Sequence, residues 1–308
     1  MGRSWLDLPG AHGGRAQVSR HHAAMHSLPL WIVTFGLAVF VANAQDTPVL
    51  QRLRDASKAA PVVVAHRGAS EQFPENTLAA LRAAVATKAL VVEFDVYQTK
   101  DGAWVVLHDA TFDRTTDAVV KFGRKDVRVD ALKLAEVRTL DAGAWKDPKF
   151  AGERVPTLEE ALAAILPAIP MVERKGGDAV ALVAELRRLD AIDRVLVQAF
   201  DWPWLEAVHR AEPKLLLGAL GSKELDAARS REIAATGAQL VHWDHRTLTA
   251  EAAAAVHAGG QLLCVYTVDP DVLLLGAAAI GCDLITTNRP ARAMALREQG
   301  LLARTRAK

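Results

Sequence analysis

The chain carries eight short runs of apolar, largely β-branched residues, and stretches with a helical pattern separate them. Strands that are apolar on both faces belong inside a protein, and intervening helices make successive strands parallel. The runs span residues 62–66, 90–96, 170–175, 194–200, 214–220, 239–243, 261–268 and 282–287. Eight such strands over about 250 residues predict a closed (β/α)8 barrel, the TIM-barrel fold.

An open, doubly wound sheet is the alternative arrangement. Such a sheet normally has a G-x-G-x-x-G turn after its first strand. Here that turn reads HRGASEQFPEN, residues 66–76, and lacks the motif, which favours the barrel. Residues 109–156 show no clear periodicity, so we expect a short insertion between the second and third barrel strands. Trp145 and Phe150 are expected to seal it against the barrel.

The N-terminal part has a different composition. Residues 28–44, LPLWIVTFGLAVFVANA, carry no charge, and the last three fit a small-x-small cleavage site. The stretch is short for a membrane span and suits a secretory signal. We expect residues 1–44 to be a signal peptide, with a retained anchor as the alternative and Met1 or Met25 as the start. Residues 45–60 then form a linker with one amphipathic turn, and residues 61–308 form the barrel domain.

Export would place the mature protein in the periplasm or outside the cell, with no stable membrane span. The formal net charge of the whole chain is only +1. A nearly neutral body has no broad cationic field, which argues against a nucleic-acid partner.

Polar residues stand at the ends of the first three predicted strands. They are His66 and Arg67, then Glu93 and Asp95, then Glu173 and Lys175. Catalytic groups of a TIM barrel lie at the carboxyl ends of its strands, and residues i and i+2 share a face. These side chains are therefore expected to meet at the barrel mouth.

Three carboxylates on neighbouring strands repel each other, and burying them unpaired is costly. A divalent cation at Glu93, Asp95 and Glu173 would remove that repulsion. An all-oxygen ligand set indicates a hard ion, Ca²⁺ or Mg²⁺. Salt bridges with basic neighbours are the alternative.

A hairpin is expected to add a second histidine. In TKDG, residues 99–102, Asp101 and Gly102 suit the centre of a type I′ turn. That register places His108 opposite Asp95 and on the same face. Two histidines with a metal and cationic side chains suit phosphoryl chemistry, because one imidazole takes a proton from the nucleophile and the other protonates the leaving oxygen.

Several motifs occur in an order that resembles the glycerophosphodiester phosphodiesterase family. They are HRG (66–68), PENT (74–77), EFD (93–95), TKDGAWVVLHDATFDRTT (99–116), LDAGAWKDPKFAGERVPTLEEAL (140–162), ERK (173–175) and GCDLITTNRP (281–290). The resemblance covers roughly residues 62–290. It implies a distorted barrel of the phosphatidylinositol phospholipase C type.

The resemblance also implies metal-dependent hydrolysis of glycerophosphodiesters to sn-glycerol 3-phosphate and an alcohol, through attack by the substrate's own 2-hydroxyl. His66 and His108 match the acid–base pair. The metal ligands match Glu93, Asp95 and Glu173, with Ca²⁺ or Mg²⁺ bound. Arg67, Lys175 and Glu75 match substrate contacts, and Asn76 supports them.

Three positions depart from the family pattern and are expected to line the substrate pocket. Ala199 replaces a serine, Tyr266 replaces a tryptophan, and Asn288 replaces an aspartate. Two other functions fit the sequence. A lysophospholipase D or phospholipase C-like enzyme would need an apolar groove, which Trp202, Trp204 and Trp243 could form. A non-catalytic, exported phosphodiester-binding barrel is the second.

Overall fold

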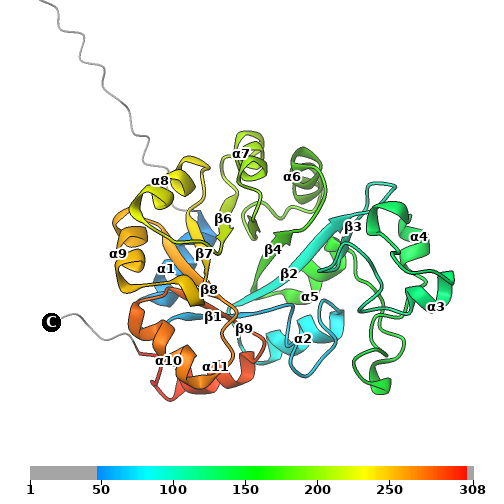
Figure 1. The fold of residues 1–308 in the computed structure, drawn as a ribbon, viewed down its shortest axis with the longest axis horizontal. Helices are drawn as coiled ribbons and strands as arrows, with labels where there is room; N and C mark the ends of the chain where they lie inside the picture. Colours follow the sequence, from blue (N-terminus) through cyan, green and yellow to red (C-terminus); the bar gives the residue numbers. More distant parts are fainter. Residues whose placement is uncertain (1–46, 304–308) are drawn as a thin grey trace, which may run out of the picture. The chain divides into compact units, whose positions relative to one another are not determined.

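The computed structural model describes residues 47–303 and confirms the closed (β/α)8 barrel (Figure 1). Its eight parallel strands follow chain order, and β1 pairs with both β2 and β9, which closes the sheet. The strands are β1 (Val62–Ala65), β2 (Val91–Gln98), β4 (Ile169–Arg174), β5 (Leu196–Ala199), β6 (Leu216–Gly221), β7 (Leu240–Asp244), β8 (Leu262–Tyr266) and β9 (Leu284–Thr287). Every predicted strand is present, and the ends differ by at most two residues.

Helices surround the strands on the outside (Figure 1). They are α2 (Leu78–Ala86), α5 (Leu158–Ile165), α6 (Ala179–Arg188), α7 (Trp202–Ala211), α8 (Ala227–Ala235), α9 (Ala250–Ala258), α10 (Asp271–Ile280) and α11 (Pro290–Glu298). Side-chain caps begin most of them. Thr157 and Glu160, for example, form a reciprocal capping box at the start of α5. No helix within residues 47–303 is long and apolar enough to cross a bilayer.

Strand residues alternate between two apolar layers. Residues such as Val63 and Val92 point outward and pack against the helices. Val62, Val64 and Val91 point inward and fill the lower barrel together with residues of the other strands. The upper positions on the inward face are polar, so the alternation itself carries the functional side chains to the mouth.

Residues 45–60 are more than the predicted linker. They contain α1 (Pro48–Ser57), a helix capped by the Thr47 hydroxyl, whose Val49, Leu50 and Leu53 are buried with the inward-facing layer. Burial of three apolar side chains stabilises this helix and makes it part of the barrel. The predicted signal segment, residues 1–44, lies outside the described residues.

The predicted hairpin forms, but its register is one residue away from the expected one. Strand β3 (Trp104–Val106) pairs with β2 so that Val96 faces Val106. Continuing that pairing places Leu107 opposite Asp95, and the Leu107 amide donates to the Asp95 carbonyl at 3.0 Å. The type I′ prediction was wrong because only Gly102 has a positive φ, +85°. The loop is a three-residue turn with one left-handed glycine.

The insertion after β3 lies beside the barrel (Figure 1), and its buried apolar residues form a separate cluster together with residues of the hairpin. It contains α3 (Ala118–Phe122), α4 (Leu134–Val137) and the short 3₁₀ helices η1 (Val129–Ala131) and η2 (Pro148–Phe150); a third 3₁₀ helix, η3 (His245–Thr247), follows β7. Phe150 packs against Phe73 of the barrel, with ring centroids 5.4 Å apart. The prediction for Trp145 was wrong, since this side chain is 38% exposed and donates to the Ala142 carbonyl.

We expect the insertion core to contribute strongly to folding. Phe112 is fully buried in it, so Phe112→Ala should lower the free energy of unfolding by about 3–5 kcal/mol. Val120 on α3 is 87% exposed, and Val120→Ala should change it by less than about 0.5 kcal/mol. Urea unfolding monitored by circular dichroism measures both. Equal, small effects would show that the insertion core does not stabilise the protein.

Candidate active site

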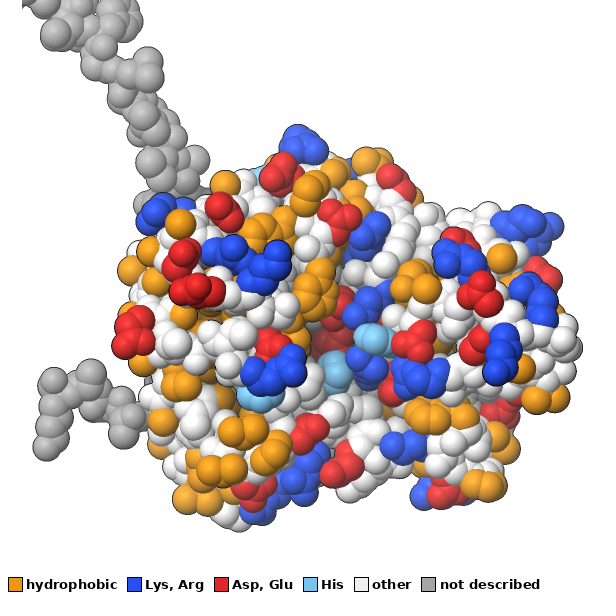
Figure 2. All heavy atoms as spheres, in the orientation of Figure 1, with side chains coloured by type: hydrophobic (Ala, Val, Ile, Leu, Met, Phe, Trp, Pro, Cys, Tyr) orange, Lys and Arg blue, Asp and Glu red, His pale blue; other side chains and the backbone are white. Residues whose placement is uncertain are grey.

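The mouth of the barrel is a polar cavity of about 240 Å³ above the apolar inner layer. Its lining residues come from every barrel strand or the loop after it, and they include all the predicted catalytic and metal-binding residues except Asp95, which lies buried beside it. Histidine, acidic and basic side chains gather in a hollow at the centre of this face (Figure 2). The alternation of inward-facing and outward-facing strand residues explains why these side chains lie at the mouth. Val64 and Met171 face inward, and His66 and Glu173 follow them by two residues.

Glu93, Asp95 and Glu173 form a compact acidic triad. One carboxylate oxygen from each lies within 4.8 Å of the others, and all three side chains are buried. Strands β2 and β4 pair with Asp95 beside Glu173, which brings the carboxylates together. Burial and the Asp95 and Glu173 charges raise the pKa of Glu93 well above its usual range. Burial and the Asp95 charge raise the pKa of Glu173 to about 7.

Two cations balance part of this charge. Lys175 Nζ lies 3.3 Å from Asp95 Oδ1 and also pairs with Glu173. Arg67 Nε lies 3.4 Å from Asp95 Oδ2, and the Arg67 amide donates to Glu93 Oε2 at 2.8 Å. These ion pairs were the predicted alternative to a metal, and they do form. Two cations cannot neutralise three carboxylates, however.

Three buried carboxylate oxygens lack a hydrogen bond from the described residues. They are Glu93 Oε1, Asp95 Oδ1 and Glu173 Oε1. The last two contact the Lys175 ammonium as ion pairs, whereas Glu93 Oε1 has neither a hydrogen bond nor an ion pair among the described residues. A buried acceptor without a partner is costly and calls for an unseen ligand. The donor set is entirely oxygen, so the residues fit a hard divalent cation.

The turn after β1 aims Arg67 at this triad. Arg67 has a φ of +54°, a left-handed conformation that is uncommon outside glycine. Gly68 follows with φ +83°, and a Cβ there would lie 2.5 Å from the Ala80 backbone. The close approach of α2 therefore requires a glycine in HRG. Such local strain is typical of functional sites.

His66 is partly buried and lines the cavity, with Nδ1 2.7 Å from Asn288 Oδ1. Burial and the adjacent Arg67 guanidinium lower the pKa of His66 to about 4. The imidazole is therefore neutral at physiological pH and can accept a proton.

His108 reaches the same cavity from the loop after β3, although the register predicted for it was wrong. The turn of the chain beyond Leu107, rather than cross-strand pairing with Asp95, carries it there. Its Nδ1 lies 2.6 Å from Asp109 Oδ1. Burial lowers the pKa of His108, although the Asp95 charge and the Asp109 contact oppose that effect.

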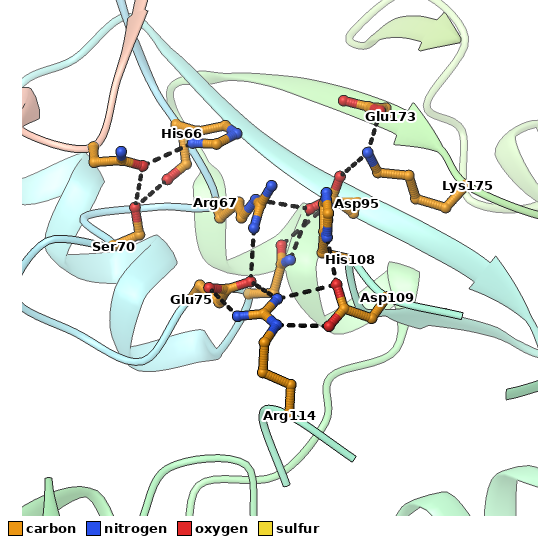
Figure 3. A network of polar contacts seen from close by, with 12 residues as sticks. His66, Arg67, Ser70, Glu75, Asp95, His108, Asp109, Arg114, Glu173 and Lys175 are labelled. Carbon is orange, nitrogen blue, oxygen red and sulfur yellow. Dashed lines mark hydrogen bonds and ion pairs between the residues drawn. The ribbon is translucent and has the colours of Figure 1, made fainter. Parts of the chain in front are cut away.

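Glu75 supports the site from behind rather than lining the main cavity. It accepts from Arg67 Nη1 at 2.9 Å and from both Arg114 Nη atoms at 2.8 and 3.0 Å (Figure 3). Arg114 also binds Asp109, the partner of His108. This network joins the β1 loop to the insertion. Sequence reasoning did not assign Asp109 or Arg114, although both stand in the HDATFDR stretch.

Other polar residues at the mouth also went unassigned. Gln198 Oε1 accepts from His242 Nδ1 at 2.7 Å, and the Thr286 hydroxyl lies 2.9 Å from His242 Nε2. All three line the cavity and are buried. Each stands two residues after an inward-facing leucine of its strand, and this spacing could have identified them as cavity residues from the sequence. Asn76 bonds Asp95 through both its amide atoms, as a supporting residue should.

None of the three tryptophans that could have formed an apolar groove for the lysophospholipase D or phospholipase C-like alternative lines the cavity. Trp202, Trp204 and Trp243 each donate the indole N–H to a backbone carbonyl, of Leu220, Gly177 and Lys223 respectively. Phe200 and Tyr266 are the aromatic residues that line the cavity. Of the three positions expected to line the pocket, Tyr266 does so, whereas Ala199 is buried in the outward-facing layer and Asn288 contacts His66 instead.

Comparison with known proteins gives a consistent picture. The model of the glycerophosphoryl diester phosphodiesterase family matches residues 66–292. A glycerophosphodiester phosphodiesterase of Bacillus subtilis (strain 168) is 30% identical over 287 residues, covering 85% of this chain and 94% of the relative. A glycerophosphodiester phosphodiesterase of Caldanaerobacter subterraneus is 35% identical over 173 residues, covering 52% of this chain and 66% of the relative.

Solved structures agree with these relatives. An Oleispira antarctica phosphodiesterase, in complex with the product sn-glycerol-3-phosphate, superposes with a TM-score of 0.70 at 26% identity, covering 78% of this chain and 97% of that one. A glycerophosphodiester phosphodiesterase from Agrobacterium tumefaciens has a TM-score of 0.64 at 28% identity, covering 76% and 99%.

The family match begins at His66, at the end of β1, and extends into α11, so it spans almost the whole barrel and every residue of the acidic triad. The chain therefore belongs to the glycerophosphoryl diester phosphodiesterase family and is an enzyme of that class.

Proposed function

We propose that this enzyme hydrolyses glycerophosphodiesters to sn-glycerol 3-phosphate and an alcohol, with a divalent cation and with His66 and His108 as proton-transfer groups. One observation carries the proposal: a single cavity holds both imidazoles, two cationic side chains and carboxylates of the buried triad. The product bound to the Oleispira antarctica relative supports the choice of product.

Arg67 and Lys175 are the groups of this chain that would contact the phosphate. Their side chains face the cavity, and both are partly accessible at 17–18% of their surface. Cationic donors held in a partly buried site stabilise negative charge that develops on phosphate oxygens. Glu75 has both oxygens bonded to arginines, so its contribution is to hold Arg67 in place.

The two histidines would divide the proton transfers. One imidazole takes the proton of the attacking hydroxyl as the new P–O bond forms, and the other gives a proton to the leaving alcohol as the old P–O bond breaks. If the attacking group is the 2-hydroxyl of the glycerol, a cyclic phosphate forms first. Water then opens it with the two proton transfers reversed, which returns both rings to their starting states.

Glu93, Asp95 and Glu173 would hold the cation, either Ca²⁺ or Mg²⁺. A cation held there would supply positive charge beside the phosphate and a counter-charge for the carboxylate oxygens that lack hydrogen bonds. Lys175 lies beside two of these carboxylates, Asp95 and Glu173. Although burial lowers its pKa, the Asp95 and Glu173 carboxylates hold the pKa of Lys175 above its usual value. A protonated lysine suits a phosphate contact.

Removal of divalent cations should abolish activity. We expect a chelator to reduce glycerol 3-phosphate release from glycerophosphocholine by at least about 100-fold, since the triad would lose its counter-charge. Excess Ca²⁺ or Mg²⁺ should restore the rate, and the better ion identifies the natural one. Chelator saturated with Ca²⁺ beforehand is the control. Full activity after exhaustive chelation would contradict the role of the triad.

His108→Ala should lower kcat/KM by about 10²–10⁴-fold, as expected for loss of one proton-transfer group. The melting temperature should stay near that of the wild type because the side chain is only partly buried. His209→Ala on α7, outside the cavity lining, is the matched control and should keep full activity. Turnover of His108→Ala near the wild-type rate would refute the assignment.

A further inference from the structure

His66 is held by a second layer of residues from the two neighbouring strand ends. Its Nδ1 lies 2.7 Å from Asn288 Oδ1, just after β9. Asn288 in turn donates through Nδ2 to Asp269 Oδ2 at 2.7 Å, in the loop after β8. Strands β8, β9 and β1 are neighbours in the barrel, so the three residues form a chain across adjacent loops.

Asp269 decides which way the Asn288 amide points. Its Oδ1 accepts from the Thr287 hydroxyl at 3.0 Å and from the backbone N–H of Asn288 at 2.8 Å. Its Oδ2 is left for the side chain of Asn288. A carboxylate can only accept, so the NH₂ group of Asn288 must face it, and the amide oxygen must face His66.

The amide oxygen then decides the state of the ring. An amide oxygen has no proton to give, so His66 Nδ1 must carry the hydrogen of this bond. In a neutral imidazole the other nitrogen, Nε2, is then without a proton. The Ser70 hydroxyl, 2.9 Å from the same amide oxygen and 2.7 Å from the His66 carbonyl, closes the cluster (Figure 3).

We propose that Asn288, oriented by Asp269, is a positioning residue that keeps His66 in the tautomer with Nδ1 protonated and Nε2 bare and available in the catalytic cavity. This goes beyond the pocket-wall role expected for Asn288 from its departure from the family pattern. The proposal concerns the imidazole of His66. Only its expected effect on kcat/KM rests on the proposed function.

The two histidines of the site therefore have different partners. His108 Nδ1 contacts a carboxylate, Asp109, whereas His66 Nδ1 contacts a neutral amide. A carboxylate beside an imidazole stabilises the charged ring, and an amide does so much less. Asn288 separates Asp269 from His66, so the Asp269 carboxylate stabilises the protonated ring less than a direct contact would. Asn288 and Asp269 therefore fix the orientation of the His66 ring without favouring its charged form.

Other titratable groups also face His66, and the test must leave them in place. They come from the β1 loop, the segment before α2, β2, β7 and the loop after β9, and they are Arg67, Glu71, Glu75, Asp95, His242 and Arg289. Burial and Arg67 already lower the pKa of His66 to about 4. An exchange confined to positions 269 and 288 alters none of these groups.

The tautomer can be measured without substrate. Nitrogen NMR of the full-length, ¹⁵N-labelled protein distinguishes a protonated from a bare ring nitrogen, and His66→Gln assigns the signals. We expect Nδ1 to be protonated and Nε2 to be bare. In Asp269→Asn, the side chain at position 269 can donate as well as accept, so the side-chain amide of Asn288 can adopt either orientation. We therefore expect both neutral tautomers of His66 to be present. Asp271→Asn, an exposed residue paired with Arg292, is the matched control and should behave as wild type.

A double exchange, Asp269→Asn with Asn288→Asp, moves the negative charge next to the ring and conserves shape. The amide introduced at 269 can accept from Thr287 and donate to position 288, and the carboxylate introduced at 288 can accept from His66. We expect the tautomer to be retained and the pKa of His66 to rise by about one to three units. The acidic limb of the kcat/KM profile should move up with it, because protonated His66 cannot accept a proton.

Each outcome is decisive. A wild-type spectrum with Nε2 protonated overturns the proposal, as does a tautomer that Asp269→Asn leaves unchanged, or an unmoved His66 pKa in the folded double variant. If the double variant fails to fold, the wild-type and Asp269→Asn spectra still decide. Failure of the wild type to hydrolyse glycerophosphocholine would refute the proposed function while leaving the tautomer test intact.

Discussion

The site depends on one electrostatic constraint: three buried carboxylates must share a space that two cationic side chains cannot fully neutralise. Strands β2 and β4 pair so that Asp95 lies beside Glu173, and Glu93 shares a face with Asp95. Isolated buried charge is so costly that such a cluster persists only if it is paired, protonated or bound to a cation. The raised pKa values of Glu93 and Glu173 express that cost, and the carboxylate oxygens that lack hydrogen bonds indicate where a cation would relieve it.

The barrel places this cluster at the mouth through simple alternation. Apolar inward residues fill the lower layer, with α1 packed against it, and polar inward residues follow two positions later. The insertion then adds His108, and Arg114 ties it to the β1 loop through Asp109 and Glu75. The site is thus built from rigid strand ends on one side and from a separately packed insertion on the other.

The barrel strands and the acidic triad could be predicted from the sequence. Strand positions follow from apolar runs, and the acidic triad follows from i, i+2 spacing at strand ends. The hairpin register failed because the choice between a two-residue and a three-residue turn depends on the φ of Asp101, which TKDG does not reveal. The residues that orient His66 were equally hidden, since Asn288 reaches the ring from another loop and Asp269 reaches Asn288 from a third. Helix α1 was mistaken for a linker because its three apolar residues are informative only once the barrel floor is known.

The most direct test of the cation site is equilibrium binding to the metal-free, full-length protein by isothermal titration calorimetry. The structure predicts one Ca²⁺ or Mg²⁺ per chain in the wild type, and loss of binding when Asp95→Asn removes a charge from the triad. No saturable binding by the wild type, or unchanged binding by the Asp95→Asn variant, would contradict the account.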